Sequence, residues 1–329
     1  MTVLAPGRVT VDVRLVPDDL RAALRRDARA GLSATPKVMP PVWFYDDRGC
    51  ELYEAITRTP EYYPFRTERA LLARSAGEIA EAAGASVLVE LGSGTSEKTR
   101  LLLDAMAAAG AGLDGYVPFD VAEGTLRAAA GAVADEMGIG VHAVVGDFHR
   151  HLDAVRQVAG ARLVAFLGST IGNLARAERA AFLAEVAGLL TPDDRFLLAT
   201  DLVKPRDRLV AAYDDAAGVT AAFNLNLLAV LNRELGADFD LRRFEHVAVW
   251  DAANRWIEMR LRATEAMTVT LSRIGLLATF AAGEQMRTEI SAKFTARQVS
   301  DELGSAGMAV TGLWADPAGD YLLTLARTV

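Results

Sequence analysis

The middle of the chain alternates short, β-rich apolar segments with longer segments of helical spacing. SVLVELGSG (residues 86–94) ends in glycines, and the following TSEKTRLLLDAMAAA is rich in Ala and Leu at helical spacing. The same order recurs at residues 115–120, 141–148, 162–173 and 194–203. Near-continuous apolar strands that alternate with helices predict an α/β fold with a parallel sheet covered on both faces.

The C-terminal segment differs from this pattern. AVTGLWADPAGDYLLTLARTV (residues 309–329) holds two apolar runs around the turn-rich ADPAGD, which predicts an antiparallel hairpin added to the edge of the sheet. A doubly wound, Rossmann-like parallel sheet that ends in such a hairpin is typical of class I methyltransferases, by analogy at the level of the fold. We expect residues 67–203 and 294–329 to form this domain.

Two further segments lie outside the alternation. The N-terminal one holds a helical stretch, DDLRAALRRDARAGL, and an aromatic cluster that ends in EYYPFR. The other begins with a long helical region through YDDAAGVTAAFNLNLLAVLNREL and continues as strand-like alternation at RWIEMRLRA and MTVTLS. We expect residues 14–66 and 204–293 to pair as a second, α+β substrate-binding domain.

Composition narrows the class of protein. The 329 residues carry a net charge of −8, which leaves no basic surplus for a nucleic-acid backbone. The chain does not open with a signal-peptide run, and no segment approaches the length of a membrane span. We therefore predict a cytoplasmic protein. We also expect it to be a monomer. Its single cysteine, Cys50, fits a reducing compartment. His149 and His151 could share a metal, but a solvated loop pair is favoured and no metal is expected.

The loop ELGSGTSEKT (residues 90–99) nearly fits two phosphate-binding patterns, and Glu97 disfavours both. In a P-loop, the residue before the Lys must be glycine, because a side chain there enters the phosphate site. In a dinucleotide fold, the third glycine lets the helix pack closely on the strand. S-adenosylmethionine avoids both objections, because Gly92 and Gly94 allow close backbone approach. Its amino-acid end needs polar partners, which could be Ser93, Thr95 and Lys98.

The ends of the following strands support this cofactor. Asp120 ends the second strand, where an acid can bind both ribose hydroxyls. Asp147 and Phe148 end the third strand. There Asp147 can accept from the adenine amino group, and Phe148 can lie beside the adenine ring. At the fourth, FLGSTIGN, Gly168 can allow close approach and Asn173 offers a polar group. A helix N-cap is the alternative role for each carboxylate, and turn chemistry is the alternative for Asn173.

Several long motifs carry a resemblance to a known family. They are ATPKVMPPVWFYD, TRTPEYYPFRTE, VELGSGTSEKTR, FLGSTIGN, AYDDAAGVTAAFN, FDLRRFEHVAVW and TEISAKF. From about residue 20 to the C-terminus, the chain resembles the histidine-specific, S-adenosylmethionine-dependent N-methyltransferases of ergothioneine biosynthesis. The resemblance implies trimethylation of the α-amino group of L-histidine to hercynine, with S-adenosylmethionine consumed as the methyl donor.

The resemblance also implies roles for individual residues. Cofactor contacts are implied for Gly92, Lys98, Asp120, Asp147 and Phe148. Substrate contacts are implied for Asn173 and Tyr213 at the carboxylate, and for Tyr62, Glu289 and Ser291 at the imidazole. Tyr45 matches a position near the reacting nitrogen, where we expect it to shape the pocket without being an essential base.

Two positions qualify this assignment. Met259 matches a pocket-lining position, although ordinary core packing is an equal alternative. Tyr53, in ELYEAI, stands where an aromatic such as Phe is usual, which changes polarity but not bulk.

The predicted acceptor rests on Glu289 and Ser291. Two residues apart on a strand, they would project from one face and could pair with the two ring nitrogens of histidine. An exposed strand alternation is the plainer interpretation of TEIS. Two other functions remain open: methylation of a different aromatic amino acid, and a noncatalytic cofactor-binding module that docks a protein partner.

Overall fold

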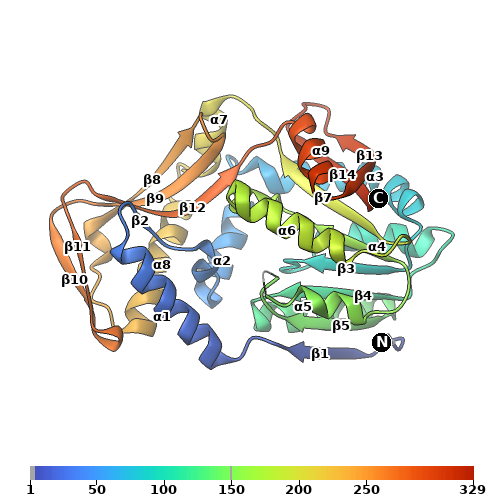
Figure 1. Ribbon diagram of the computed structural model, residues 1–329, viewed down its shortest axis with the longest axis horizontal. Coiled ribbons are helices and arrows are strands. Elements are labelled where there is room, and N and C mark those ends of the chain that lie inside the picture. The colour runs from blue at the N-terminus through green and yellow to red at the C-terminus, as the bar shows by residue number, and fades with distance from the viewer. Residues whose placement is uncertain (1–3, 149) are drawn as a thin grey trace. The chain divides into compact units, whose positions relative to one another are not determined.

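The computed structural model describes residues 4–148 and 150–329, and its chain divides into two compact units (Figure 1). The first unit comprises Met1–Leu15, Pro64–Val203 and Lys293–Val329. The second comprises Val16–Tyr63 and Lys204–Ala292.

An eight-stranded sheet forms the centre of the first unit, in the order β1-β5-β4-β3-β6-β7-β14-β13. Its strands are β1 (Val9–Val13), β3 (Val87–Leu91), β4 (Gly115–Asp120), β5 (Gly140–Val145), β6 (Arg162–Phe166), β7 (Arg195–Asp201), β13 (Met308–Ala315) and β14 (Tyr321–Thr328). The strands from β1 to β7 pair in parallel, whereas β14 pairs antiparallel with both β7 and β13. The predicted α/β sheet with a C-terminal hairpin is therefore confirmed.

The helices of this unit follow the strands as the alternation predicts. They are α3 (Tyr63–Ala83), α4 (Thr99–Ala108), α5 (Glu123–Met137), α6 (Arg176–Leu189) and α9 (Ala296–Ser305), with the 3-10 turns η2 (Leu152–Gln157) and η3 (Thr170–Asn173). Helix α5 packs on β4, β5 and β1, and it is followed by Gly138, whose φ of +67° few other residues adopt. All residues of β3 and β6 are buried, as expected of central parallel strands.

Strand β1 is an element that the sequence interpretation missed. It pairs in parallel with β5, from Val9 opposite Val141 to Val13 opposite Val145. Because it lies at the sheet edge and none of its five residues is buried, it lacks the continuous apolar run that marks the central strands.

A four-stranded sheet in the order β2-β12-β9-β8 organises the second unit, beside a β10-β11 hairpin. The strands are β2 (Lys37–Val38), β8 (Phe244–Asp251), β9 (Trp256–Ala263), β10 (Met267–Leu271), β11 (Leu276–Phe280) and β12 (Gln285–Ala292). The helices are α1 (Pro17–Ser33), η1 (Pro41–Phe44), α2 (Asp47–Thr57), α7 (Arg206–Ala212), α8 (Val219–Leu235), η4 (Leu241–Arg243) and η5 (Ser272–Ile274).

The long helical region predicted from Tyr213 onward is wrong over its first six residues. Helix α7 ends at Ala212, and α8 begins at Val219 after Gly218, whose φ is +73°. The Asp215 carboxylate accepts from the backbone nitrogens of Val219 (2.9 Å) and Thr220 (2.7 Å), which caps α8 and favours the break over a continuous helix.

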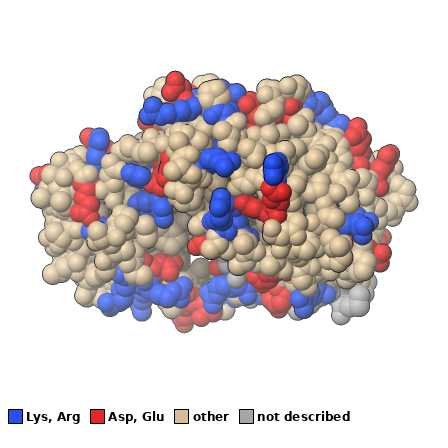
Figure 2. Space-filling model, turned by 45° about the horizontal axis from the view of Figure 1, so that its top comes forward, with Lys and Arg blue, Asp and Glu red and all other residues tan. Residues whose placement is uncertain are grey.

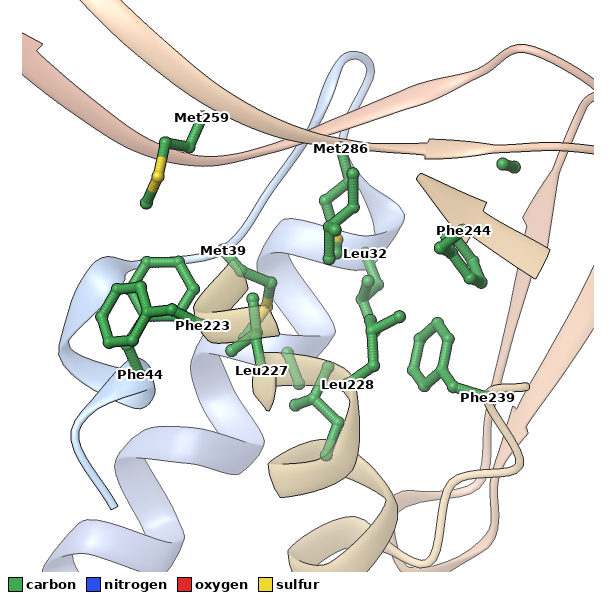
Figure 3. Close-up of a cluster of buried hydrophobic side chains, with 14 of the residues drawn as sticks. Leu32, Met39, Phe44, Phe223, Leu227, Leu228, Phe239, Phe244, Met259 and Met286 are labelled. Carbon is green, nitrogen blue, oxygen red and sulfur yellow. The ribbon is translucent and has the colours of Figure 1, made fainter. Parts of the chain in front are cut away.

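The core of the second unit packs α8 between the other helices and the sheet. Phe44 of η1 and Phe223 of α8 lie with ring centroids 4.6 Å apart, and Met259 points from β9 toward them (Figure 3). A register shift between Arg287 and Glu289 marks a bulge in β12 opposite β9. The bulge leaves Thr288 as the extra residue of that strand.

Two features of the structure concern nucleic acids and membranes as partners: the distribution of surface charge and the length of the apolar helices. On the face drawn in Figure 2, Lys and Arg side chains are interspersed with Asp and Glu side chains. Among the residues that the structure describes, no helix combines the length and the apolar character needed to cross a bilayer.

Candidate active site

The loop between β3 and α4 has the backbone conformation of a close-approach site. Gly92 and Gly94 have φ of +73° and +50°, and the nitrogens of Gly92 and Ser93 donate to the Phe119 carbonyl at 2.7 and 3.1 Å. A Cβ added at either glycine would meet no described atom within 4 Å. Both glycines are thus required for backbone conformation, and both leave open space for a ligand.

Asp120 is held against this loop. Its Oδ2 accepts from the Gly94 nitrogen at 2.8 Å and its Oδ1 from the Ala122 nitrogen at 3.0 Å. Burial raises the pKa of Asp120, and these backbone donors oppose that effect. Each oxygen retains a further lone pair, so the carboxylate can accept from a diol such as a ribose.

Asp147 and Phe148 follow β5 as predicted. Phe148 lies edge-on to Phe166 and Phe182, with ring centroids 5.3 and 5.8 Å away, which fixes one side of its ring. The Asp147 nitrogen donates to Nδ1 of the His151 ring at 3.1 Å. The predicted pair of this histidine, His149, lies outside the described residues. Within residues 4–148 and 150–329, no group of three or more His, Cys, Asp or Glu side chains could hold a metal ion.

Two side chains of the loop bear directly on cofactor identity. The Ser93 hydroxyl is buried, and no described residue gives it a hydrogen-bond partner, so it is suited to a polar group of a ligand. The Glu97 side chain is 58% exposed and lies 3.4 Å from the Arg69 guanidinium. The acid that disfavours the phosphate-binding patterns in the sequence therefore points to solvent in the structure.

Glu68 is a residue that the sequence interpretation did not single out. Its fully buried carboxylate pairs with the Lys98 ammonium and accepts from the Gly168 nitrogen at 2.7 Å. The Lys98 ammonium also lies 5.2 Å from the centre of the Phe65 ring. One carboxylate thereby joins the predicted cofactor lysine to the turn after β6. Glu68 is the last residue of TRTPEYYPFRTE, a motif of the resemblance, and this position was the sequence signal that could have identified it.

A second buried acid, Glu90, also escaped the sequence interpretation. Its Oε2 accepts from the Thr99 hydroxyl at 2.5 Å and the Tyr116 hydroxyl at 2.7 Å, and Tyr116 bonds Ser96 at 2.9 Å. Burial raises the pKa of Glu90 to about 7, against the lowering effect of these hydrogen bonds. Ser96 has a φ of +55°, so this network holds a strained position of the loop.

The turn that carries Asn173 is hydrogen-bonded to the backbone of Asp201, whose side chain belongs to a buried ion pair. Ser169 has a φ of +55°, and its hydroxyl oxygen accepts from the Asp201 nitrogen at 2.9 Å. The Asp201 carboxylate lies 2.8 Å from the Lys293 ammonium, and both side chains are buried. Asn173 ends the 3-10 turn η3, so Gly168 and Asn173 lie at the carboxyl end of β6 in the first unit.

The other predicted substrate residues lie in the second unit. Tyr62 and Tyr213 have ring centroids 6.0 Å apart, and the Tyr213 hydroxyl is 2.7 Å from the Ser291 hydroxyl. On the sheet, Glu289 lies opposite Met259 in the β12–β9 ladder. Facing residues in an antiparallel pair share a face, so Met259 lies beside Glu289.

The aromatic residues of this unit surround the same region. Tyr45 lies edge-on to Tyr53 and Phe223, with ring centroids 5.9 and 5.7 Å away. Burial raises the pKa of the Tyr62 phenol well above its usual range. The ionisable groups that raise it further are Tyr53, Tyr213, Glu289 and Tyr45. Tyr62 is therefore neutral, and the structure brings these predicted residues within electrostatic range of it.

The sequence of the chain is similar to those of several known proteins. It is 57% identical to the histidine N-alpha-methyltransferase of Mycolicibacterium smegmatis over 95% of this chain and 97% of that protein. It is 52% identical to the histidine N-alpha-methyltransferase of Mycobacterium tuberculosis, over 97% and 99%. It is 30% identical to ergothioneine biosynthesis protein 1 of Neurospora crassa, over 69% of this chain and 26% of that protein.

The family itself covers nearly the whole sequence. Residues 24–328 match the family described as histidine-specific methyltransferase, SAM-dependent. S-adenosylmethionine is accordingly the cofactor of this chain. The chain belongs to the family of S-adenosylmethionine-dependent, histidine-specific methyltransferases.

Proposed function

We propose that this enzyme transfers three methyl groups to the α-amino nitrogen of L-histidine and so makes hercynine for ergothioneine biosynthesis. The observation that carries the proposal is the placement of Glu289 and Ser291 on one strand, with the Ser291 hydroxyl bonded to that of Tyr213 at 2.7 Å. The names of the mycobacterial relatives and of the Neurospora crassa protein support the acceptor and the pathway.

Glu289 and Ser291 together match an imidazole ring. A neutral imidazole has one N–H donor and one acceptor nitrogen, which suit a carboxylate and a hydroxyl. Met259, opposite Glu289, offers an apolar contact to the ring face. An acceptor without ring nitrogens would leave the carboxylate and hydroxyl without that pairing, at a cost of about 1–3 kcal/mol.

The remaining substrate residues hold the other end of histidine in this proposal. Tyr213 binds the carboxylate at that end, whereas the neutral Tyr62 phenol serves as a hydrogen-bond donor at the imidazole end. Tyr45, packed against Tyr53 and Phe223, shapes the space around the amine. Because a neutral amine needs only to be oriented and shielded from water, no side chain is required as an essential base, and the proton can leave to water or a nearby phenol.

The cofactor residues are those of the first unit. Gly92, Gly94 and Ser93 would hold its amino-acid end together with Lys98, Asp120 its ribose, and Asp147 and Phe148 its adenine. When bound, S-adenosylmethionine supplies a methyl group on a sulfonium that is already a good leaving group. We propose accordingly that the first unit binds the cofactor and the second unit provides the imidazole recognition.

The test is mass spectrometry after incubation with S-adenosylmethionine and an equimolar mixture of the twenty amino acids. Histidine alone should gain three methyl groups. Glu289→Gln should lower kcat/KM for histidine about 10-fold or more, whereas Glu265→Gln, at an exposed position of the same unit, should leave it unchanged. Methylation of another aromatic amino acid would refute the acceptor, and cofactor binding without any methylation would favour the noncatalytic alternative.

The role of Tyr45 has its own test. Tyr45→Phe should retain most of the turnover with histidine, because the ring packing survives. A variant that binds histidine normally and loses nearly all turnover would show that the phenol is essential.

A further inference from the structure

Three polar side chains, one of them on the strand that carries Glu289 and Ser291, form a hydrogen-bonded chain within the second unit. The Thr288 hydroxyl donates to Oδ1 of Asn224 at 2.7 Å. Nδ2 of Asn224 lies 2.8 Å from Nδ1 of His246, and Nε2 of His246 lies 2.7 Å from the Tyr213 carbonyl oxygen. Asn224 and Thr288 are both completely buried. No step of the proposed reaction uses these three side chains.

Backbone carbonyls at both ends fix the protons of this chain. The Arg260 carbonyl lies 3.1 Å from Nδ2 of Asn224, and a carbonyl can only accept, so the amide nitrogen must face it. That same nitrogen faces Nδ1 of His246, which must therefore accept. At the other end the Tyr213 carbonyl requires a donor, so Nε2 of His246 carries the hydrogen. The two ends independently assign the same neutral tautomer.

The chain connects the elements that carry the predicted substrate residues. Tyr213 directly follows α7, and Nε2 of the His246 ring donates to its carbonyl. Thr288 is the bulged residue of β12, and its hydroxyl also lies 3.0 Å from the Met259 carbonyl on β9. The bulge sets which residues of β12 share a face with Glu289. Moving any member of the chain would therefore shift Tyr213 relative to Glu289 and Ser291.

We propose that His246, held as its neutral Nε2–H tautomer by Asn224, is a positioning residue that fixes the spacing between Tyr213 and the Glu289–Ser291 pair. This inference rests on the proposed function, because that spacing matters only if these residues bind histidine. His246 contacts the backbone of Tyr213 and the side chain of Asn224, and so acts through them.

The surroundings of the ring favour the neutral form. Burial lowers the pKa of His246, and the Tyr213 carbonyl and the charges of Asp214 and Asp215 oppose that effect. Its partner on β9 is the apolar Leu261. Protonation would put a second N–H against the Asn224 amide, donor against donor, and would break the chain at that point.

Two matched substitutions separate the two hydrogen bonds of the ring. In His246→Gln, the amide nitrogen can reach the position of Nε2 and keep the bond to the Tyr213 carbonyl. In His246→Asn, the amide oxygen can reach the position of Nδ1 and keep the bond from Asn224, while the Tyr213 carbonyl loses its donor. Both should fold, which thermal unfolding checks.

Steady-state kinetics of the full chain then gives the decisive comparison. His246→Asn should raise the KM for L-histidine about 5- to 20-fold, the loss expected for one buried hydrogen bond, and His246→Gln should raise it much less. The affinity for S-adenosylmethionine should stay within about 2-fold in both, since a purely structural defect would weaken both ligands. Equal KM values for histidine in wild type and His246→Asn would overturn the inference.

Nitrogen NMR of protein labelled at histidine tests the tautomer without any turnover. Wild-type His246, assigned by the signal that His246→Asn lacks, should show an unprotonated Nδ1 and a protonated Nε2 at pH 7. Asn224→Asp should protonate Nδ1, because a carboxylate there accepts. A charged ring or an Nδ1–H tautomer in wild type would refute the assignment. Failure of wild type to methylate histidine would instead refute the proposed function.

Discussion

Replacing Glu90 with Gln should stabilise the protein at alkaline pH. The Glu90 side chain is 3% exposed, and burial raises its pKa from the ordinary 4.5 to about 7. Gln has nearly the same shape and keeps an oxygen for the Thr99 and Tyr116 hydroxyls, but it carries no charge to bury. The substitution therefore removes the desolvation of the carboxylate and retains the packing below the cofactor loop.

The sign follows from proton binding in the two states. Between pH 4.5 and about 7, the native protein binds a proton at Glu90 that the unfolded chain has released. The stability that protonated Glu90 contributes to the wild-type protein is thus fully present below pH 4.5 and is lost as the pH rises to about 7. Above that pH, the contribution of Glu90 to the free energy of unfolding no longer changes. At 1.36 kcal/mol per pKa unit, the gap between these values amounts to about 3 kcal/mol. Glu90→Gln should exceed wild type by up to that amount at pH 8 and match it near pH 4.

Urea unfolding of both proteins from pH 4 to 8 measures this difference. Groups other than Glu90 titrate equally in both, so the difference in unfolding free energy isolates this carboxyl. Glu81→Gln, an exposed substitution on α3, is the control and should show no pH-dependent difference. If Glu90→Gln were less stable than wild type at pH 8, the ionised carboxylate would be stabilising the native state through Thr99 and Tyr116, and burial would not have raised its pKa.

Three other perturbations give clear expectations. Glu68→Gln should weaken S-adenosylmethionine binding about 10-fold by calorimetry, because the Lys98 ammonium loses its buried counter-charge; an unchanged Kd would exclude a positioning role for Glu68. Asp201→Asn should lower the free energy of unfolding by about 3–5 kcal/mol, because it removes the negative charge 2.8 Å from the buried Lys293 ammonium, and a change under 1 kcal/mol in urea would contradict this. Gly49→Ala would place a Cβ 1.6 Å from a backbone carbonyl oxygen, so it should lower Tm sharply, and a wild-type Tm would show that the turn can shift.

The sequence allowed the position of a candidate site residue to be predicted where that residue ends or directly follows an apolar strand. Asp120 was expected from its place after an apolar run, and β4 does end at that residue. Buried partners such as Glu68, Glu90 and His246 were not identified, because an acid or histidine within a helix or strand has no local pattern that marks it as buried. Glu68 contacts Gly168, one hundred residues further along the chain.

The sequence by itself determined the order of strands and helices, the C-terminal hairpin and the glycine-rich loop, because hydrophobic period and turn residues act over a few neighbours. Tertiary structure alone decided the edge strand β1, the break between α7 and α8, the bulge at Thr288 and the tautomer of His246. Each of these depends on partners that are distant in sequence, and a buried polar group takes the conformation that satisfies its hydrogen bonds.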